Sequence, residues 1–94
     1  MDAFPFEENK IEEAVFIRTF YNDVESGDLV WHRDREDRII ESIEKTNWKI
    51  QLDNELPKEI NSPTFIPMGV YHRLIKGDGD LKLKLIKINN YIHE

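Results

Sequence analysis

The sequence predicts an all-β fold, either a sandwich or a small barrel, and two observations carry this prediction. Short segments rich in β-branched and aromatic residues recur along the chain, with turn-forming residues between them and no long helical period. In the last of these segments Leu81, Leu83 and Leu85 alternate with Lys82 and Lys84, which is the two-residue period of a strand with one wet face. Many short strands of this kind are typical of all-β sandwiches and small barrels.

Seven strands are expected, and turn-forming residues mark where each one ends. A turn or two of helix around residues 7–13 precedes them and is the single helix that the pattern offers. Gly77-Asp78-Gly79 lies between the last two apolar runs and predicts a tight turn, so these two runs should form a hairpin. The expected strands span residues 14–21, 29–34, 38–43, 47–52, 64–67, 71–75 and 81–88.

Length and composition limit the chain to one domain, expected over residues 1–94. The 94 residues are 39% hydrophobic and 11% aromatic, which is enough for one modest core, and 34% charged, which covers its surface. Cysteine is absent, so disulfides and thiolate metal sites are excluded. The lack of cysteine also fits a reducing compartment, and we expect a cytoplasmic protein.

Charge and hydropathy exclude two kinds of partner. The net charge of -6 disfavours nucleic acid, whose phosphates require a basic face. No apolar run approaches the roughly 20 residues that span a bilayer, and the acidic start MDAFPFEENK lacks the basic lead of a signal peptide. We therefore expect neither a nucleic-acid nor a membrane partner.

A turn-forming motif, FIPMGVYHR, occupies residues 65–73. Pro67 fixes its own φ and Gly69 permits a conformation that other residues avoid, so Pro-x-Gly predicts a sharp turn. The chain leaves this turn and presents His72 near the start of the next expected strand. The turn therefore fixes the position of one histidine, His72.

A polar motif, VWHRDREDR, occupies residues 30–38, and six of its nine residues are charged. Together the two motifs resemble those of the cupin family, which consists of small double-stranded β-helix barrels. The second cupin motif reads Gly, five residues, Pro-x-Gly, two residues, His, three residues, Asn. Pro67, Gly69 and His72 match this spacing. Asn61 stands at the first glycine position and tolerates the same left-handed turn, while Lys76 stands at the asparagine position.

The first cupin motif has His-x-His, followed four or five residues later by glutamate. His32 and Asp34 stand at the paired positions, so aspartate replaces the second histidine. The glutamate position falls on Arg38 or Ile39, and Asp37 lies one residue before it. The first motif is therefore a variant of the family pattern.

The resemblance covers residues 14–88 and implies a jelly-roll barrel with a divalent metal ion in its mouth. On a strand, residues two apart point to one face, so His32 and Asp34 can converge on one ion. His72 would be the third ligand, and two histidines with one carboxylate form the facial triad of non-haem iron sites. Such ligands suit Mn, Fe, Ni or Zn about equally well.

The same three residues also fit a metal-free polar network, so two interpretations stay open. Arg38 could point inward and bond Asp34 or an anionic ligand in the mouth, and an inward arginine would repel a cation. Asp37 is either a fourth metal ligand or a rim partner of Arg35 or Arg38. The choice between Asp37 and Arg38 as the inward residue therefore separates a metal centre from a different kind of site.

Two classes of function follow from these alternatives. The first is a metal-binding cupin, a small enzyme in one version of this hypothesis, and the second is a metal-free cupin that binds a small molecule or another protein. Cupins commonly pair through sheet edges, so the resemblance implies a homodimer in either case. The sequence names no substrate and no reaction.

Three large aromatic side chains complete the expectations. Trp31 precedes His32 on an expected strand and so should face the opposite side, into the core or a subunit interface. Trp48 and Tyr71 are expected to pack in the core.

Overall fold

The structure is a computed structural model that describes residues 5–88, so the expected domain limits at 1 and 94 lie outside the described residues. It confirms the all-β fold, with every strand pair antiparallel. Within residues 5–88 no helix is long and apolar enough to cross a membrane. The elements are β1 (Glu7–Glu12), β2 (Val15–Phe20), the 3-10 turn η1 (Ser26–Asp28), β3 (Asp37–Ser42), β4 (Lys49–Leu52), β5 (Lys58–Glu59), β6 (Thr64–Ile66), β7 (His72–Ile75) and β8 (Leu81–Ile88).

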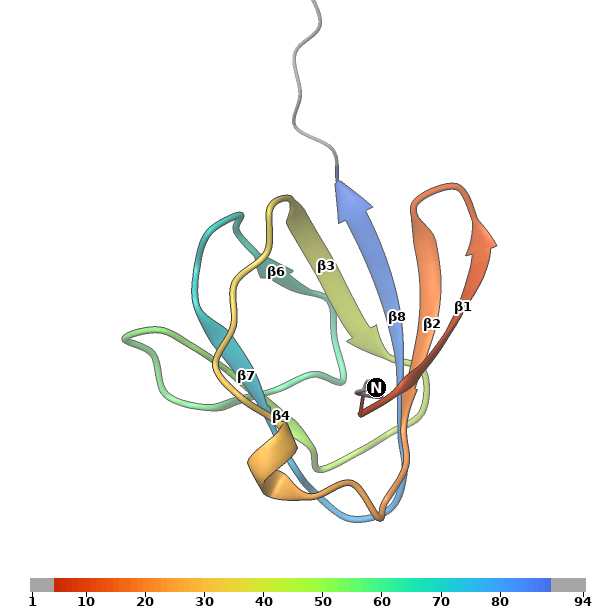
Figure 1. The fold of residues 1–94 in the computed structure, drawn as a ribbon, viewed down its shortest axis with the longest axis vertical. Coiled ribbons are helices and arrows are strands. Elements are labelled where there is room, and N and C mark those ends of the chain that lie inside the picture. The colour runs from red at the N-terminus through yellow and green to blue at the C-terminus, as the bar shows by residue number, and fades with distance from the viewer. Residues whose placement is uncertain (1–4, 89–94) are drawn as a thin grey trace, which may run out of the picture.

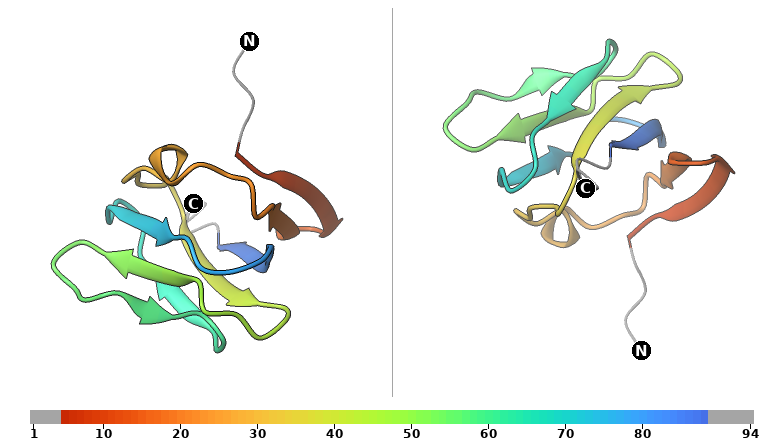
Figure 2. Two further views of the ribbon diagram at one scale, coloured as in Figure 1. Left: turned by 90° about the horizontal axis from the view of Figure 1, so that it is seen from below. Right: turned by 90° about the horizontal axis from the view of Figure 1, so that it is seen from above.

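The strands form two sheets, one of five strands in the order β1-β2-β8-β3-β6 and one of three in the order β5-β4-β7 (Figure 1). Along the chain, β3 lies in the large sheet, β4 and β5 in the small sheet, β6 in the large sheet, β7 in the small sheet and β8 in the large sheet. Seen from either end, the small sheet lies on one side of the barrel and β1 and β2 lie on the other (Figure 2). This repeated passage between sheets winds the chain into a barrel.

The core lies between the two sheets and follows the alternation of the strands. In β8 the three leucines are buried and the lysines between them are exposed, as the sequence pattern predicted. Trp48 has no exposed surface, so its expected place in the core is confirmed. The buried hydrophobic side chains are Phe20, Val24, Ile40, Trp48, Ile50, Leu52, Ile60, Ile66, Leu81, Leu83 and Leu85.

The segment expected as a helix is instead the edge strand β1. Each of its residues is exposed, and it pairs with β2 in a hairpin whose turn includes Ala14 in the left-handed region, at φ 65°. Its six residues therefore gain their backbone hydrogen bonds from β2 and not from a helical turn. The helix prediction was wrong because pairing with a neighbouring strand outweighs the weak local preference of this polar segment.

The expected hairpin between the last two strands is also wrong, because β7 pairs with β4 and β8 pairs with β2 and β3. Residues 76–80 carry the chain from the small sheet to the large one. Gly77 allows a close passage there, since a Cβ at this position would lie 2.3 Å from Asn47 Oδ1. Trp48 fixes the same crossing, because its indole N–H donates to the Gly79 carbonyl at 3.0 Å.

Two further expectations fail in the segments that flank the site. Residues 29–34 form no regular strand and make one isolated bridge, from His32 to His72. Among the described residues other than glycine, Ala14 and Asn54 alone have positive φ, so the left-handed turn expected at Asn61 is wrong. The Asn61 side chain acts as a clamp instead, because it accepts from the Thr46 N–H and donates to the Thr46 carbonyl.

Candidate metal centre

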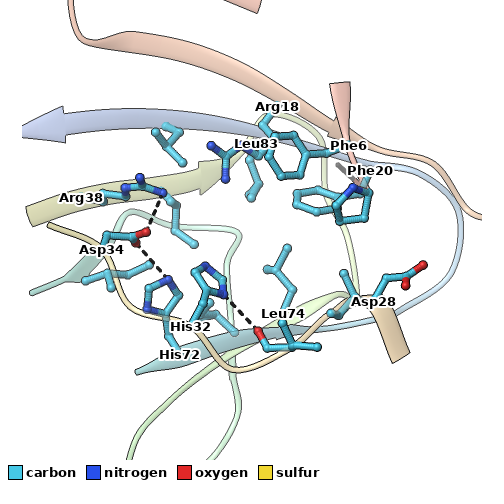
Figure 3. A pocket seen from close by; sticks show the side chains of 17 residues that line it. Phe6, Arg18, Phe20, Asp28, His32, Asp34, Arg38, His72, Leu74 and Leu83 are labelled. Carbon is cyan, nitrogen blue, oxygen red and sulfur yellow. Dashed lines mark hydrogen bonds and ion pairs between the residues drawn. The ribbon is translucent and has the colours of Figure 1, made fainter. Parts of the chain in front are cut away.

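The structure brings His32, Asp34 and His72 together at one end of the barrel (Figure 3). One potential ligand atom from each residue lies within 4.8 Å of the other two. His72 is the first residue of β7, and the other two residues lie in the segment that precedes β3. The two motifs that the sequence pointed to therefore meet in space.

Main-chain hydrogen bonds join the two motifs. The His32 N–H donates to the His72 carbonyl at 3.0 Å, and the His72 N–H donates to the His32 carbonyl at 2.8 Å. The Gly69 N–H donates to the Asp34 carbonyl at 3.0 Å. Gly69 has a φ of 80°, so the sharp Pro-x-Gly turn occurs where the sequence placed it. These bonds hold the two histidines in a fixed relation.

Each histidine ring is oriented by a carbonyl two residues before it. His32 Nδ1 lies 3.0 Å from the Val30 carbonyl oxygen, and His72 Nδ1 lies 2.9 Å from the Val70 carbonyl oxygen. A carbonyl accepts, so in a neutral ring Nδ1 carries the hydrogen and Nε2 keeps a lone pair. A ring held through Nδ1 in this way is a common arrangement for a histidine that binds a metal through Nε2.

The Asp34 carboxylate faces one of these rings without a hydrogen bond to it. Its Oδ2 lies 3.2 Å from His72 Nε2, yet it is buried and has no hydrogen-bond partner among the described residues. With the ring hydrogen on Nδ1, a nitrogen lone pair and a carboxylate oxygen face one another, and a cation between them would relieve the repulsion. Two atoms that each lie about 2.0–2.2 Å from one ion are separated by about 3 Å, so the spacing suits shared coordination.

Arg38 points inward, as one of the two interpretations expected. Its Nη1 lies 3.3 Å from Asp34 Oδ1, so the contact is a single one and not bidentate. Its Nε donates to Glu36 Oε2 at 2.6 Å, which neutralises much of its charge. Because Arg38 contacts Oδ1, the second oxygen of Asp34 is left facing the histidine side.

Asp37 lies at the Pro-x-Gly turn and not among the three candidate ligands, so the structure does not support it as a fourth ligand. Its Oδ1 accepts the Met68 N–H at 2.7 Å, within the Pro-x-Gly turn. Asp37 is not part of the three-residue group that meets at one point. Its carboxylate thus connects the start of β3 to the turn that precedes His72.

Burial and nearby polar groups together shift the pKa values of two residues of the site. Burial is the main cause that lowers the pKa of His32 below its ordinary value, so this ring favours the neutral, metal-binding form. Burial alone would raise the pKa of Asp34, but its contact with His72 and the charge of Arg38 outweigh burial and lower that pKa. Both effects favour the protonation states that a metal requires.

The site opens into a cavity of about 390 Å³ that runs between the two sheets. His32, Asp34, His72 and Arg38 line its polar end, and apolar side chains from both sheets line much of the remainder. Figure 3 shows these groups around one space. The apolar lining includes Phe6, Phe20, Ile50, Leu74 and Leu83.

Arg18 also lines this cavity, and the sequence interpretation did not single it out. The signal was present, because Arg18 has the same phase in β2 as Phe16 and Phe20, and this phase faces the barrel interior. Phe20 is buried in the core and Phe16 packs against it. A charged residue between two inward-facing aromatics is the pattern that could have identified it.

Two aromatic residues beside the histidines lie on the outer surface. Tyr71 is 43% exposed, so its expected place in the core is wrong. Trp31 is 40% exposed and therefore does not enter the core either. The Arg73 guanidinium lies over the Trp31 ring, 4.7 Å from its centroid, and Arg33 lies 5.2 Å from the centroid of Tyr71. Both rings therefore face outward, beside a buried His72 and an exposed His32.

Comparisons with solved structures identify the fold. The sequence matches no protein-family model and no curated protein sequence. A putative mannose-6-phosphate isomerase from Ralstonia eutropha superposes with a TM-score of 0.62 at 12% identity, over 89% of this chain and 82% of that one. Fe(II) HppE gives 0.60 at 16% identity, over 79% and 41% of the two chains.

A DMSP lyase from Ruegeria pomeroyi is similar as well, with a TM-score of 0.59 at 14% identity, over 87% of this chain and 42% of the lyase. The chain spans about two fifths of the length of the DMSP lyase and Fe(II) HppE chains that it matches. These neighbours have the cupin fold. The present chain therefore has the cupin double-stranded β-helix fold that its two motifs suggested.

Proposed function

We propose that this protein is a small cupin that binds one divalent metal ion through His32, Asp34 and His72, in a barrel mouth open to a small-molecule ligand. The ligand set of two imidazoles and one carboxylate suits Mn, Fe, Ni or Zn. Such an ion, when bound, would act as a Lewis acid on a ligand that reaches the open coordination positions.

One observation carries this proposal, namely the buried Asp34 Oδ2, which has no hydrogen-bond partner within residues 5–88 and lies 3.2 Å from His72 Nε2. A buried carboxylate oxygen without a partner is costly, and native proteins rarely keep one without a reason. The orientation of both rings by carbonyls turns Nε2 of each toward the same space. A cation at this point would satisfy all three groups together.

The remaining residues of the site hold these ligands in place. Arg38 binds the far oxygen of Asp34, and Glu36 holds Arg38. The apolar lining of the cavity excludes water from one side of the site, which strengthens electrostatic interactions there. Three ligands would leave positions open toward the cavity, where a small molecule could approach.

The second candidate function is a metal-free cupin that binds a small molecule. The inward position of Arg38 favours it, because a guanidinium 3.3 Å from Asp34 Oδ1 disfavours a nearby cation. In this case His72 Nε2 and Asp34 Oδ2, 3.2 Å apart, would form a direct polar contact in place of a shared metal ion. The small molecule would then bind equally well with and without added metal.

Thermal unfolding of untagged protein separates the two candidates. Metal binding predicts that added Mn, Fe, Ni or Zn raises the melting temperature of the native chain and leaves that of His72→Ala unchanged, because binding to the folded state alone is stabilising. Lys82→Ala, on the outer face of β8, serves as the matched control and should respond like the native chain. No rise with any of the four metals would exclude the metal centre and favour the metal-free candidate.

The same preparation tests the expected homodimer. Light scattering after size exclusion gives the mass directly, and a mass of twice 11.2 kDa is the expected result. A monomer under these conditions would contradict the homodimer without affecting the metal proposal, because all three proposed ligands belong to one chain.

A further inference from the structure

Arg18 occupies an unusual position for a charged residue, in the middle of β2 and facing the barrel interior. Its neighbours of the same phase, Phe16 and Phe20, belong to the packed interior. The Arg18 side chain is 13% exposed, and burial lowers its pKa below the ordinary value. A guanidinium that is this far removed from water is costly and is usually retained for a specific partner.

The contacts of Arg18 use one edge of the guanidinium. Nε and Nη2 donate to the same oxygen of Glu8, at 2.7 and 2.6 Å, and the Phe6 ring centroid lies 4.0 Å from Cζ. Neither contact with Glu8 involves Nη1. Glu8 lies on the edge strand β1, directly opposite Arg18 in the pairing of β1 with β2, so the two side chains project from the same face of the sheet.

Arg18 shares the cavity with the proposed metal ligands and with Arg38. Figure 3 shows the Arg18 and Arg38 guanidinium groups at the same end of this cavity, and each influences the other electrostatically. The two arginines face the three carboxylates of Asp34, Glu8 and Glu36. The polar end therefore carries one net negative charge without a metal, and one net positive charge once a divalent ion is bound.

The rest of the cavity is small and mainly apolar, and among the described residues the one further charged group that lines it is Asp28, at the end away from the two arginines (Figure 3). Phe20, Leu74 and Leu83 line it across from the polar end, within a total volume of about 390 Å³. A space of this size lies at the lower end of the range for small-molecule pockets. It suits a ligand of a few carbon atoms with a single charged group.

From these contacts we infer that the cavity binds a short monocarboxylic acid, with Arg18 holding the carboxylate and the apolar lining taking the carbon chain. The assignment rests on the proposed function for its charge balance, since the ion supplies the positive charge that one carboxylate neutralises. Nη1 of Arg18 makes no contact with Glu8 and can donate a charge-assisted hydrogen bond to a carboxylate. A single excess positive charge favours a monoanion over phosphate, which carries more charge, and over a neutral molecule.

Calorimetric titration of Zn-loaded, untagged protein tests this assignment with three probes: butyrate, butyramide and inorganic phosphate. Butyrate should bind, and butyramide should bind at least about tenfold more weakly, because a hydrogen bond to a charged group is roughly twice as strong as one to a neutral group. Phosphate should also bind at least about tenfold more weakly, because it carries more negative charge than the polar end neutralises and has no carbon chain for the apolar lining. Arg18→Met should weaken butyrate by at least about tenfold. Lys82→Met, which removes an exposed lysine from the outer face of β8, should leave butyrate affinity unchanged.

A second variant guards against a trivial loss of structure. Glu8→Gln removes the competing carboxylate from Arg18 and should tighten butyrate binding about three- to tenfold, a gain that misfolding does not produce. Absence of saturation by butyrate in metal-loaded protein would overturn the inference, as would equal affinity in Arg18→Met or equal or tighter binding of phosphate.

Failure of the proposed function gives a different result. Protein that takes up no metal shows this in the zinc titration itself, before any probe is added. The butyrate titration is then carried out on the metal-free protein. Binding that Arg18→Met abolishes would still support the carboxylate site, and absence of binding would overturn it.

Discussion

His32 and His72 make the same local contacts but lie in different surroundings. Each ring is held by the carbonyl two residues before it, and the two residues exchange reciprocal main-chain hydrogen bonds. His72 begins β7 and is 4% exposed, whereas His32 is exposed and belongs to a segment with no regular strand. The second motif therefore has a scaffold of its own, and the first depends on a single bridge to it. Loss of His72 should affect folding and metal binding, while loss of His32 should affect metal binding alone.

His72→Ala is expected to have the largest effect of any single change. It removes one metal ligand and a buried ring, which is 4% exposed and whose centroid lies 4.3 Å from that of His32. Metal affinity should fall by at least about 100-fold, and metal-free protein should lose about 2–3 kcal/mol of unfolding free energy because a cavity replaces the ring. Urea unfolding with and without metal measures both quantities. A metal-free stability equal to that of the native chain would contradict the scaffold role.

His32→Ala should separate the two effects. Metal affinity should again fall by about 100-fold, but His32 is more exposed than His72 and lies outside the regular strands, so the metal-free protein should lose less than about 1 kcal/mol. The same urea experiment compares the two variants directly. If the two substitutions lower the unfolding free energy of the metal-free protein equally, the two motifs do not differ in their contribution to folding.

Gly69→Ala tests whether the Pro-x-Gly turn positions His72. A Cβ would meet no atom within 4 Å, but the φ of 80° strains any residue with a side chain. A loss of about 1–2 kcal/mol is expected, with a metal affinity several-fold weaker as the turn shifts. Gly27→Ala is the matched control, because Gly27 also has open space around it and does not have positive φ. A change of the same size at Gly27 would mean that the strain at Gly69 is not the cause.

Asp37→Ala should have the smallest effect of these changes, and it tests whether Asp37 supports the turn before His72 or binds the metal. Loss of the bond that Asp37 accepts from the Met68 N–H should cost about 1 kcal/mol, with metal affinity changed less than about tenfold. Asp37→Asn keeps an oxygen at this position and should restore most of the stability. A fall in metal affinity as large as that of His72→Ala would instead make Asp37 a fourth ligand.

The sequence was sufficient for the fold class and for the meeting of the two motifs. Alternation of leucine and lysine placed β8, and Pro67 with Gly69 placed the turn before His72, because both signals are local. The pairing of β7 and β8 was wrong, since adjacency in sequence suggested a hairpin that the two sheets exclude. Long-range pairing of this kind leaves no trace in a single sequence.

The sequence predicted which residues form the site, but it did not predict the backbone conformation that holds them. His32 and Asp34 face one space although they lie on no strand, because the bridge to His72 replaces a full ladder. Asn61 was expected in a left-handed turn and serves as a side-chain clamp, a role that the substitution of asparagine for glycine does not reveal. Arg18 was overlooked, although it lies between two inward-facing aromatic residues of β2.

A titration of zinc into untagged protein, with Asp34→Asn as the comparison, tests the central claim most directly. Asparagine keeps the shape of the side chain but removes the anionic oxygen that lies 3.2 Å from His72 Nε2. The native chain should bind one ion per chain, and Asp34→Asn should bind at least about 100-fold more weakly. Substoichiometric binding by the native chain, or equal affinity in the two proteins, would contradict a metal centre at this site.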